Sequence, residues 1–477
     1  MERGRLTFLP RMTNDGLKLI APRITPALDP MFRPASLATR AFREEAELSG
    51  RAVPVRIAIE QADGSIFHFV TNIFGADHPS AAGNFRYVER FLKFLLWSRG
   101  GYRIYFDGPK ELHAELAAYY KDTGTGKFDA DIMGGRIYEK PFDVVHTSEI
   151  PMAKESSAPL GRHLDGCRIG FDLGGSDRKV AAVIDGKAVF SEEIVWTPIA
   201  EKDPQWHYDQ INDLLKRAAA HLPRVDAIGG SSAGVFVNSR VKVASLFRGV
   251  PPDVFHSRVK DLFLELRKEW KVPFEIANDG EVTALAGSMA LRENAVFGLA
   301  FGTSTAAGYV TPDGNITTWL NELAFAPVDY NPNAPVDEWS GDYGCGVQYF
   351  SQQCVGRLMP VAGIEVDSAL PLPEKLKHVQ NLMEKGDYRA RKIYETIGTY
   401  LGYAIGHYAD FYDIRHVLIL GRVTTGAGAE LILNGAREVL ELEFPELGRK
   451  VEFHVPDEKE KRHGQAIAAA SLPNINA

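Results

Sequence analysis

The chain has 477 residues, of which 45% are hydrophobic and 24% charged, a composition typical of a soluble globular protein with two or three domains. Its 54 basic and 62 acidic residues give a net charge of -8, which argues against nucleic acid as the main partner. No apolar run approaches the ~20 residues that span a bilayer, and no secretory-type segment begins the chain, so we expect a cytoplasmic protein without a membrane partner.

Residues 1–150 predict a small α/β domain of unknown role, which begins with an irregular arm. Prolines recur through residues 1–50, and we interpret this stretch as an arm that lies over another domain. Asp63-Gly64 stands between two alternating apolar runs, a strong signal for a hairpin. The further predicted elements are helices at 38–50, 84–98 and 109–121 and a strand at 102–108. None of them carries a recognisable catalytic motif or a DNA-reading helix pair.

A polar, proline-bearing stretch at 151–165 predicts a linker to a second α/β region. Beyond it the pattern predicts hairpins at 171–186 and 297–311, strands at 192–198, 225–237, 272–280 and 451–457, helices at 206–222, 254–270, 281–291 and 390–412, and a strand–turn–helix unit at 416–440. This alternation predicts layered α/β lobes at 166–298 and 299–477, with ligands at strand ends. The C-terminal helix is a candidate to return to the first lobe.

Two of these hairpins have glycine-rich turns that suit phosphate binding. The first turn contains Asp172, Gly174, Gly175 and Ser176, and the second contains Gly302, Thr303 and Ser304. Exposed backbone N–H groups in such turns favour anions, and two of them in successive lobes indicate a clamp on a polyphosphate. A Gly-Gly pair between apolar runs is also an ordinary hairpin signal, so one such turn alone would be weak evidence.

Between the two turns, the sequence Asn278-Asp279-Gly280 joins a predicted strand to a predicted helix. A helix cap followed by a turn explains these residues without any chemistry. A carboxylate at a strand end between two phosphate-type turns is also where a kinase needs its general base. Both interpretations remain open from the residues alone.

From Arg168 to the C-terminus the chain resembles the ROK family (repressors, open reading frames and sugar kinases) of the actin-like and hexokinase-like ATPases. The motifs that carry the resemblance are DLGGS at 172–176, SSAGVFVN at 231–238, ANDGEVTAL at 277–285, LAFGTSTAAG at 299–308, NELAF at 321–325 and LILGRVTTGAG at 418–428. The resemblance implies a two-lobed actin-like ATPase (ribonuclease H-like) fold, preceded here by the small α/β N-terminal domain, which has no family counterpart.

The resemblance also implies roles for individual residues. It places Asp279 on the catalytic base, and it implies that Asp172 holds Mg²⁺, most simply through water. It assigns the phosphates and nucleotide of ATP to Asp172, Gly174, Gly175, Ser176, Gly302, Thr303, Ser304 and Gly421. It assigns the sugar to Gly234, Asn238, Asn278 and Glu322.

Several departures from the family pattern change these expectations. Many ROK proteins bind zinc through a histidine and a cysteine-rich loop, but Phe325 stands at the histidine position and the loop has one cysteine, Cys345. One thiol cannot hold tetrahedral zinc, so we expect no structural zinc and apolar packing by Trp339, Tyr343 and Phe350 in its place. Ser304, Ala306 and Ala307 replace glycines of the second turn, and Asp177 and Arg178 follow the first turn.

The sequence therefore predicts an ATP- and Mg²⁺-dependent kinase that phosphorylates a hydroxyl of a hexose or a related sugar. The alternative is a non-catalytic sugar sensor on the same fold that acts through a protein partner. The acidic composition disfavours a DNA-binding form of that sensor. We further expect a homodimer and a small sugar as the ligand.

Overall fold

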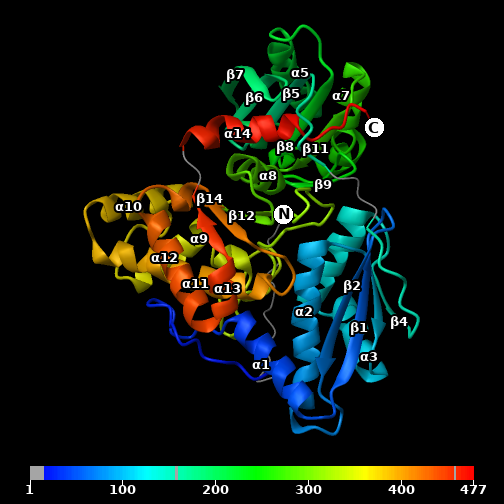
Figure 1. Ribbon diagram of the computed structural model, residues 1–477, viewed down its shortest axis with the longest axis vertical. Coiled ribbons are helices and arrows are strands. Elements are labelled where there is room, and N and C mark those ends of the chain that lie inside the picture. The colour runs from blue at the N-terminus through cyan, green and yellow to red at the C-terminus, as the bar shows by residue number, and fades with distance from the viewer. Residues whose placement is uncertain (1–15, 156–159, 456–457, 477) are drawn as a thin grey trace.

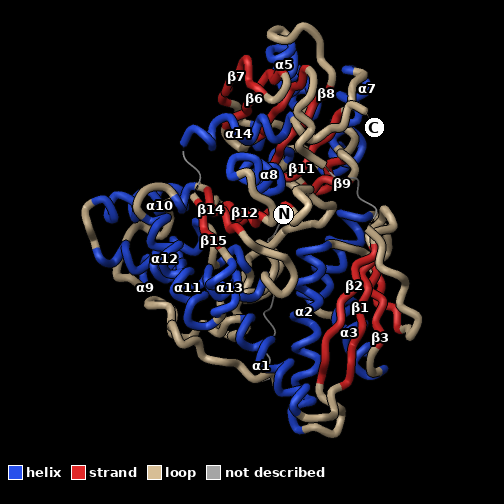
Figure 2. Tube along the Cα trace, viewed as in Figure 1, coloured by secondary structure: helices blue, strands red, loops and turns tan. Residues whose placement is uncertain are grey.

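The computed structural model describes residues 16–155, 160–455 and 458–476. The start of the predicted arm (1–15), part of the predicted linker (156–159) and the end of the last predicted strand (456–457) therefore lie outside the described residues. The described strands form three main groups (Figure 2). Two of them carry the two lobes of the actin-like ATPase fold, which confirms the predicted fold class. Within the described part of the chain, no helix has both the length and the apolar character needed to cross a bilayer.

The first lobe is built on a five-stranded sheet in the order β11-β8-β5-β6-β7. Strands β5, β8 and β11 are parallel, and β6 and β7 extend the sheet antiparallel. The strands are β5 (Cys167–Leu173), β6 (Asp177–Ile184), β7 (Lys187–Val195), β8 (Ala227–Ser232) and β11 (Phe274–Asn278), with a ribbon of β9 (Val235–Val237) and β10 (Arg240–Val243). The helices are α5 (Pro204–Ala219), α6 (Pro252–Val254) and α7 (Leu262–Trp270). The helix predicted over 254–270 is interrupted: a short π-helix, η5 (Phe255–Val259), ends at Lys260, whose carbonyl accepts a hydrogen bond from the Val241 N–H at 3.0 Å.

The second lobe is built on a four-stranded sheet in the order β13-β12-β14-β15. Its strands are β12 (Val296–Phe301), β13 (Thr305–Val310), β14 (His416–Leu420) and β15 (Glu452–His454). Its helices are α9 (Gln352–Val361), α10 (Leu372–Glu384), α11 (Tyr388–Tyr408), α12 (Gly428–Glu443) and α13 (Pro445–Lys450). Helix α8 (Asp279–Leu291) follows β11 of the first sheet but packs on β12 and β13, so it connects the two lobes.

The last helix, α14 (Glu458–Ala470), leaves the second lobe and lies across the first sheet (Figure 1). Two strand glycines make this approach possible. A Cβ at Gly170 would lie 1.8 Å from the Ala466 carbonyl oxygen, and one at Gly229 would lie 1.7 Å from the Ala469 carbonyl oxygen. Any side chain at either position would therefore push the helix off the sheet.

The N-terminal region, residues 16–155, has its own sheet in the order β2-β1-β3-β4. Its strands are β1 (Val53–Glu60), β2 (Ile66–Ile73), β3 (Arg103–Asp107) and β4 (Asp143–His146). Its helices are α1 (Ala35–Leu48), α2 (Asn84–Arg99), α3 (Lys110–Asp122) and α4 (Gly124–Ala130), which continues into a π-helix, η2 (Asp131–Tyr138). Helix α2 covers one face of the sheet and faces the two lobes (Figure 1).

One continuous hydrophobic core joins the N-terminal region to the second lobe, whereas the first lobe has a separate core. The segment before α1 lies along the helices of the second lobe. There Thr396 Oγ1 accepts a hydrogen bond from the Leu28 N–H at 3.2 Å, and Tyr400 donates one to Asp29 at 2.6 Å. Phe32 packs against the ring of Tyr400 with 4.8 Å between centroids. The N-terminal region and the second lobe therefore form one packed unit.

A buried ionic cluster also ties α2 to the loop in which the family places zinc. Arg90 donates two hydrogen bonds to the Asp342 carboxylate, at 2.7 and 3.2 Å, and Lys93 lies between Asp342 (3.1 Å) and Asp129 (3.0 Å). The expected apolar packing is present in part, because Trp339 stacks on Phe325 with 6.0 Å between ring centroids and Phe350 is buried, although Trp339 is 57% exposed and charged groups hold Asp342.

Candidate active site

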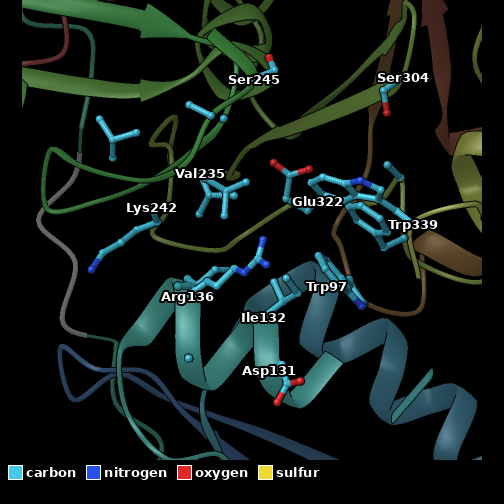
Figure 3. Close-up of a pocket in the computed structure, with 18 of the residues that line it drawn as sticks. Trp97, Asp131, Ile132, Arg136, Val235, Lys242, Ser245, Ser304, Glu322 and Trp339 are labelled. Atoms are coloured by element: carbon cyan, nitrogen blue, oxygen red, sulfur yellow. The ribbon is translucent and has the colours of Figure 1, made fainter. Parts of the chain in front are cut away.

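A cleft of about 2180 Å³ opens between the two lobes and the N-terminal region (Figure 3). It brings together eight of the residues assigned from sequence: Gly175, Gly234, Asn278, Asp279, Gly302, Thr303, Ser304 and Glu322. The residues come from both glycine turns, the start of α8 and the loop after β13. One cleft therefore holds some of the residues assigned to each of the three roles: phosphate binding, sugar binding and proton transfer.

Five assigned residues do not line the cleft: Asp172, Gly174, Ser176, Asn238 and Gly421. Asp172, Gly174 and Ser176 lie beside Gly175 in the first glycine turn. Asn238 and Ser239 have positive φ angles of 52° and 58° and form the turn of the β9–β10 hairpin. Asparagine tolerates this left-handed conformation, so the turn explains Asn238 without a sugar contact.

Hydrogen bonds fix the first glycine turn at the end of β5. The Gly174 N–H donates to the Asp177 carbonyl at 2.9 Å, and the Trp196 indole donates to the Gly174 carbonyl at 2.7 Å. Asp172 lies at the end of β5, and its buried carboxylate accepts a hydrogen bond at 2.8 Å from Ser231 on the neighbouring strand β8. Burial raises the pKa of Asp172 to about 6, although Ser231 and Lys179 favour its charged form. A buried carboxylate of this kind at a strand end suits a cation bound beside phosphate.

The two residues that depart from the family pattern after this turn have separate partners. Asp177 forms an ion pair with Lys179, with 3.2 Å between Oδ1 and Nζ, so its charge is offset within the hairpin. Arg178 is buried and extends instead to α5, where it pairs with Asp213 at 3.4 Å and donates to the Gln210 carbonyl. Neither residue therefore adds an unpaired charge to the turn.

The second glycine turn, at the end of β12, is closed in the same way as the first. The Gly302 N–H donates to the Ser304 carbonyl at 2.9 Å, and the Gly302 carbonyl accepts from the N–H of Gln352 at 2.9 Å. Gly421 follows β14 next to this turn. Its φ angle is 98°, and a Cβ there would lie 2.6 Å from the Phe301 carbonyl oxygen. Backbone packing alone therefore requires glycine at position 421, so the glycine is explained without a contact to a nucleotide.

Asp279 begins α8, and Asn278 holds it in place. The side-chain Oδ1 of Asn278 caps the helix by accepting from the Gly280 N–H at 2.7 Å, and its side-chain Nδ2 donates to the Gly234 backbone carbonyl at 2.7 Å. Asn278 thus ties the loop after β8 to the start of α8. Burial raises the pKa of Asp279, although the Gly280 N–H favours the ionised form. A carboxylate with a raised pKa is a stronger base than a surface aspartate.

Glu322 faces the same cleft, and the N-terminal region fixes its backbone. The N–H groups of Asn321 and Glu322 donate to the carbonyls of Ser98 and Trp97 at the end of α2, at 3.0 and 2.9 Å. Burial, and then the nearby charge of Asp279, raise the pKa of Glu322 to about 7. The sequence assigned Glu322 to the sugar, but it contained no signal that α2 would position this residue.

Glu281 is a buried carboxyl beside this site that the sequence analysis did not single out. It accepts hydrogen bonds from the Asn321 side chain and, at 3.4 Å, from the Tyr309 N–H. Asn321 in turn accepts one from the Tyr412 hydroxyl at 2.7 Å. Burial raises the pKa of Glu281 from 4.5 to about 8. From sequence alone, an acidic residue in the first turn of a helix is explained by the helix dipole, so nothing in the sequence indicated that Glu281 would be buried and hydrogen-bonded.

Replacing Glu281 by Gln should make stability less dependent on pH. Because folding raises this pKa, the contribution of Glu281 to stability is complete below about pH 4.5 and is lost as the pH rises through about 8. Between these two pH values, the free energy of unfolding of the wild type should fall relative to that of Glu281→Gln by up to about 1.4 kcal/mol per pH unit. Thermal melts from pH 5.5 to 8.5 measure this, with Glu430→Gln on the surface of α12 as control. Equal pH profiles for wild type and Glu281→Gln would contradict it.

The N-terminal region supplies a third wall of the cleft, and no functional residue was predicted there from sequence. Figure 3 shows Trp97, Ile132 and Arg136 on this wall, with the Arg136 guanidinium pointing into the cavity on the side of Glu322. Arg136 is exposed, and no described residue forms an ion pair with it. The wall meets the first lobe through Glu139, which pairs with Lys242 at 3.2 Å and Lys260 at 2.6 Å.

The two-lobed fold, with one glycine turn in each lobe and a carboxylate between them, places this chain in the class of actin-like ATPase folds. A family model described as "ROK family" matches residues 168–438, more than half of the 477 residues, and the chain belongs to this family. The N-terminal region lies outside the match. Among curated proteins, no match to this sequence was found.

Solved structures of ROK proteins share the fold at low sequence identity. The hexokinase of Thermus thermophilus is 19% identical over 64% of this chain and 97% of its own, with a TM-score of 0.50. The glucokinase of Streptomyces griseus, solved with glucose and AMPPNP, is 18% identical over 65% and 99%, with a TM-score of 0.47. A transcriptional regulator described as a homologue of the E. coli MLC protein is 17% identical over 65% and 79%, with a TM-score of 0.49. Of these three, the Thermus thermophilus structure has a TM-score of 0.50, and at 19% identity its likeness to this chain shows the fold alone.

Proposed function

We propose that the protein is an ATP- and Mg²⁺-dependent kinase that phosphorylates a hydroxyl of a hexose or a related sugar. The observation that carries this proposal is the cleft that is lined by Asp279, Glu322, Gly175 of the first glycine turn and residues 302–304 of the second. A non-reacting sugar sensor needs neither a buried base nor a pair of phosphate-type turns. With ATP as the donor, the proposal places the protein in the cytoplasm, and it includes no nucleic acid partner.

In this proposal Asp279 accepts the proton of the attacking sugar hydroxyl, and Glu322 accepts a hydrogen bond from another hydroxyl. Asn278 acts as a positioning residue, because its side chain is already bonded to the Gly234 and Gly280 backbones. The N–H groups around Gly175 and Gly302 hold the phosphate oxygens. Asp172 would hold Mg²⁺, which when bound offsets the charge of the phosphates.

The alternative is a sugar sensor that acts through a protein partner, and one observation favours it. Asp172, the residue assigned to Mg²⁺, is buried and does not line the cleft. A sensor of this kind would bind a sugar without turning over ATP. The N-terminal region would then be the place where the partner docks.

A screen of neutral, amino and acidic sugars with ATP and other phosphoryl donors, with and without Mg²⁺, tests the proposed function. We expect one sugar class to stimulate ADP formation, and this stimulation should require Mg²⁺. Calorimetry with the same sugars and nucleotides complements the screen. Sugar binding without any nucleotide binding would overturn the kinase proposal and favour the sensor.

Replacing Arg136 by Gln should weaken sugar binding more than it slows turnover. Arg136 points into the cleft from the third wall, and a hydrogen bond from a charged donor contributes about 1.5–3 kcal/mol. We therefore expect KM for the sugar to rise about tenfold or more while kcat changes less. Lys121→Gln, which removes a cation from α3 elsewhere in the same cleft, is the matched control. Equal effects of the two variants would exclude a specific contact by Arg136.

A further inference from the structure

A second cluster of polar side chains lies on the sheet of the second lobe, at the opposite end of β14 from Gly421. His416 begins β14 and is the register partner of Glu452 on the parallel edge strand β15. His454 stands two residues after Glu452, so all three side chains lie on one face of the sheet. One ligand atom from each of these three described residues lies within 4.8 Å of the other two, which is close enough for all three to bind one metal ion.

The distances within this cluster fit a chelate. His416 Nδ1 lies 3.1 Å from His454 Nε2. The Glu452 carboxylate oxygen lies 3.9 Å from each of these nitrogens. Ligands bound tetrahedrally to zinc at about 2.0–2.1 Å are roughly 3.3–3.4 Å apart, so small side-chain rotations would complete the geometry. All three atoms can therefore bind one ion without a shift of the strands.

The surroundings also suit a cation with nitrogen ligands. The side chains of His416 and His454 are only 12% and 24% exposed, whereas that of Glu452 is 72% exposed and free to turn inward. The Glu293 carboxylate lies 3.8 Å from His416 Nε2, on the side away from the cluster. A carboxylate there favours the tautomer that leaves Nδ1 free for a metal.

A direct hydrogen bond between the two imidazoles is the simpler explanation of their 3.1 Å distance. It accounts for the histidine pair but leaves no role for Glu452, which lies equally far from both rings. A bound cation would use all three side chains together with the flanking Glu293.

We propose that His416, Glu452 and His454 bind one divalent transition-metal ion of the Zn²⁺ type, with water in the remaining position. Two imidazoles and one carboxylate favour Zn²⁺ over Mg²⁺ or Ca²⁺, which prefer oxygen ligands. The site differs from the zinc loop of the family, which would involve residues near Cys345. It lies about 16 Å along β14 from Gly421, which is too far from the cleft for a part in phosphoryl transfer, so we assign the ion a structural role.

The ion joins the last two strands of the second sheet. Strand β15 has three residues and pairs with β14 through only three register positions. Two ligands on β15 and one on β14 would crosslink this short edge. Metal binding should therefore stabilise the folded chain by mass action, in proportion to the metal concentration relative to Kd.

Calorimetric titration of the untagged, chelator-treated full chain with ZnCl₂ tests the proposal. We expect one equivalent to bind and to raise the melting temperature, whereas MgCl₂ at the same concentration should do neither. Co²⁺ provides a spectroscopic probe, because a four-coordinate site with nitrogen ligands gives visible absorption bands. Absence of Zn²⁺ binding by the wild type would overturn the proposal.

Three variants locate the ion. His416→Ala and His454→Ala should weaken Zn²⁺ binding by more than about 100-fold, since loss of a supporting group alone costs about 10- to 100-fold. Glu452→Gln alters a mostly exposed side chain, so it should fold normally and still bind Zn²⁺ more weakly. His378→Ala on the surface of α10 is the control. Zn²⁺ binding that is unchanged in both histidine variants would place the ion elsewhere. These measurements do not depend on whether the protein is a kinase.

Discussion

The Asp279→Asn variant should lose sugar kinase activity while it keeps its fold and its affinity for the sugar. A general base contributes about 10²- to 10⁴-fold to turnover, and an amide cannot accept the hydroxyl proton. Asn at this position keeps the size of the side chain, and the cap made by Asn278 is untouched. We therefore expect kcat to fall by at least about 100-fold with little change in sugar Kd, measured by coupled ADP release and by calorimetry.

Asp313→Asn serves as control for this experiment, because Asp313 is an exposed carboxylate on the turn after β13. It should leave kcat and sugar affinity at wild-type values. An Asp279→Asn protein that turns over at the wild-type rate would remove Asp279 from the base position. A variant that no longer binds sugar would instead indicate that Asp279 acts mainly in binding.

The fold and the centre of the candidate site could be predicted because their signals are local in sequence. A strand, a Gly/Ser/Thr turn and a second strand specify each hairpin by themselves, and the structure has strands on both sides of Gly175 and Gly302. The cap at Asn278 likewise needs only its own neighbours. These short-range patterns placed Asp279 between two turns before any tertiary contact was known.

The rest of the site depends on contacts between distant segments, which leave no local signal. Glu322 is held by backbone carbonyls of α2, more than 220 residues earlier in the chain. Arg136 has no motif around it, and only the packing of η2 against the lobes directs it into the cleft. At Asn238 the family order suggested a sugar contact, and the left-handed turn there gives a second explanation for the same residue.

The same limit applies to the loop around Asp342. From sequence, the missing zinc ligands suggested apolar packing by nearby aromatic residues. The structure has such packing between Trp339 and Phe325, but it also has Arg90 and Lys93 of α2 bonded to Asp342, and Arg90 stacks over the Tyr343 ring at 5.4 Å. Charged residues on α2 carry no sign that they will be buried, because an amphipathic helix can expose such residues to water.

Replacing Asp342 by Asn should give the largest loss of stability among single substitutions at this junction. Burial alone would raise the pKa of Asp342, but the charges of Arg90 and Lys93 outweigh it and hold that pKa well below its usual range. Removal of one partner from a buried ion cluster leaves uncompensated charge and costs about 3–5 kcal/mol. The melting temperature should fall, and protease cleavage within residues 16–155 should become faster.

Asp131→Asn is the matched control, because Asp131 pairs with Lys127 at 2.6 Å on the exposed side of the same region. An exposed pair of this kind contributes at most about 1 kcal/mol, so the control should melt within a few degrees of the wild type. Because α2 also holds the backbone of Glu322, loosening it through Asp342→Asn should raise KM for the sugar as well. An Asp342→Asn protein with unchanged melting and unchanged KM would mean that the hydrophobic core alone fixes α2, and that the ionic cluster is dispensable for both stability and the site.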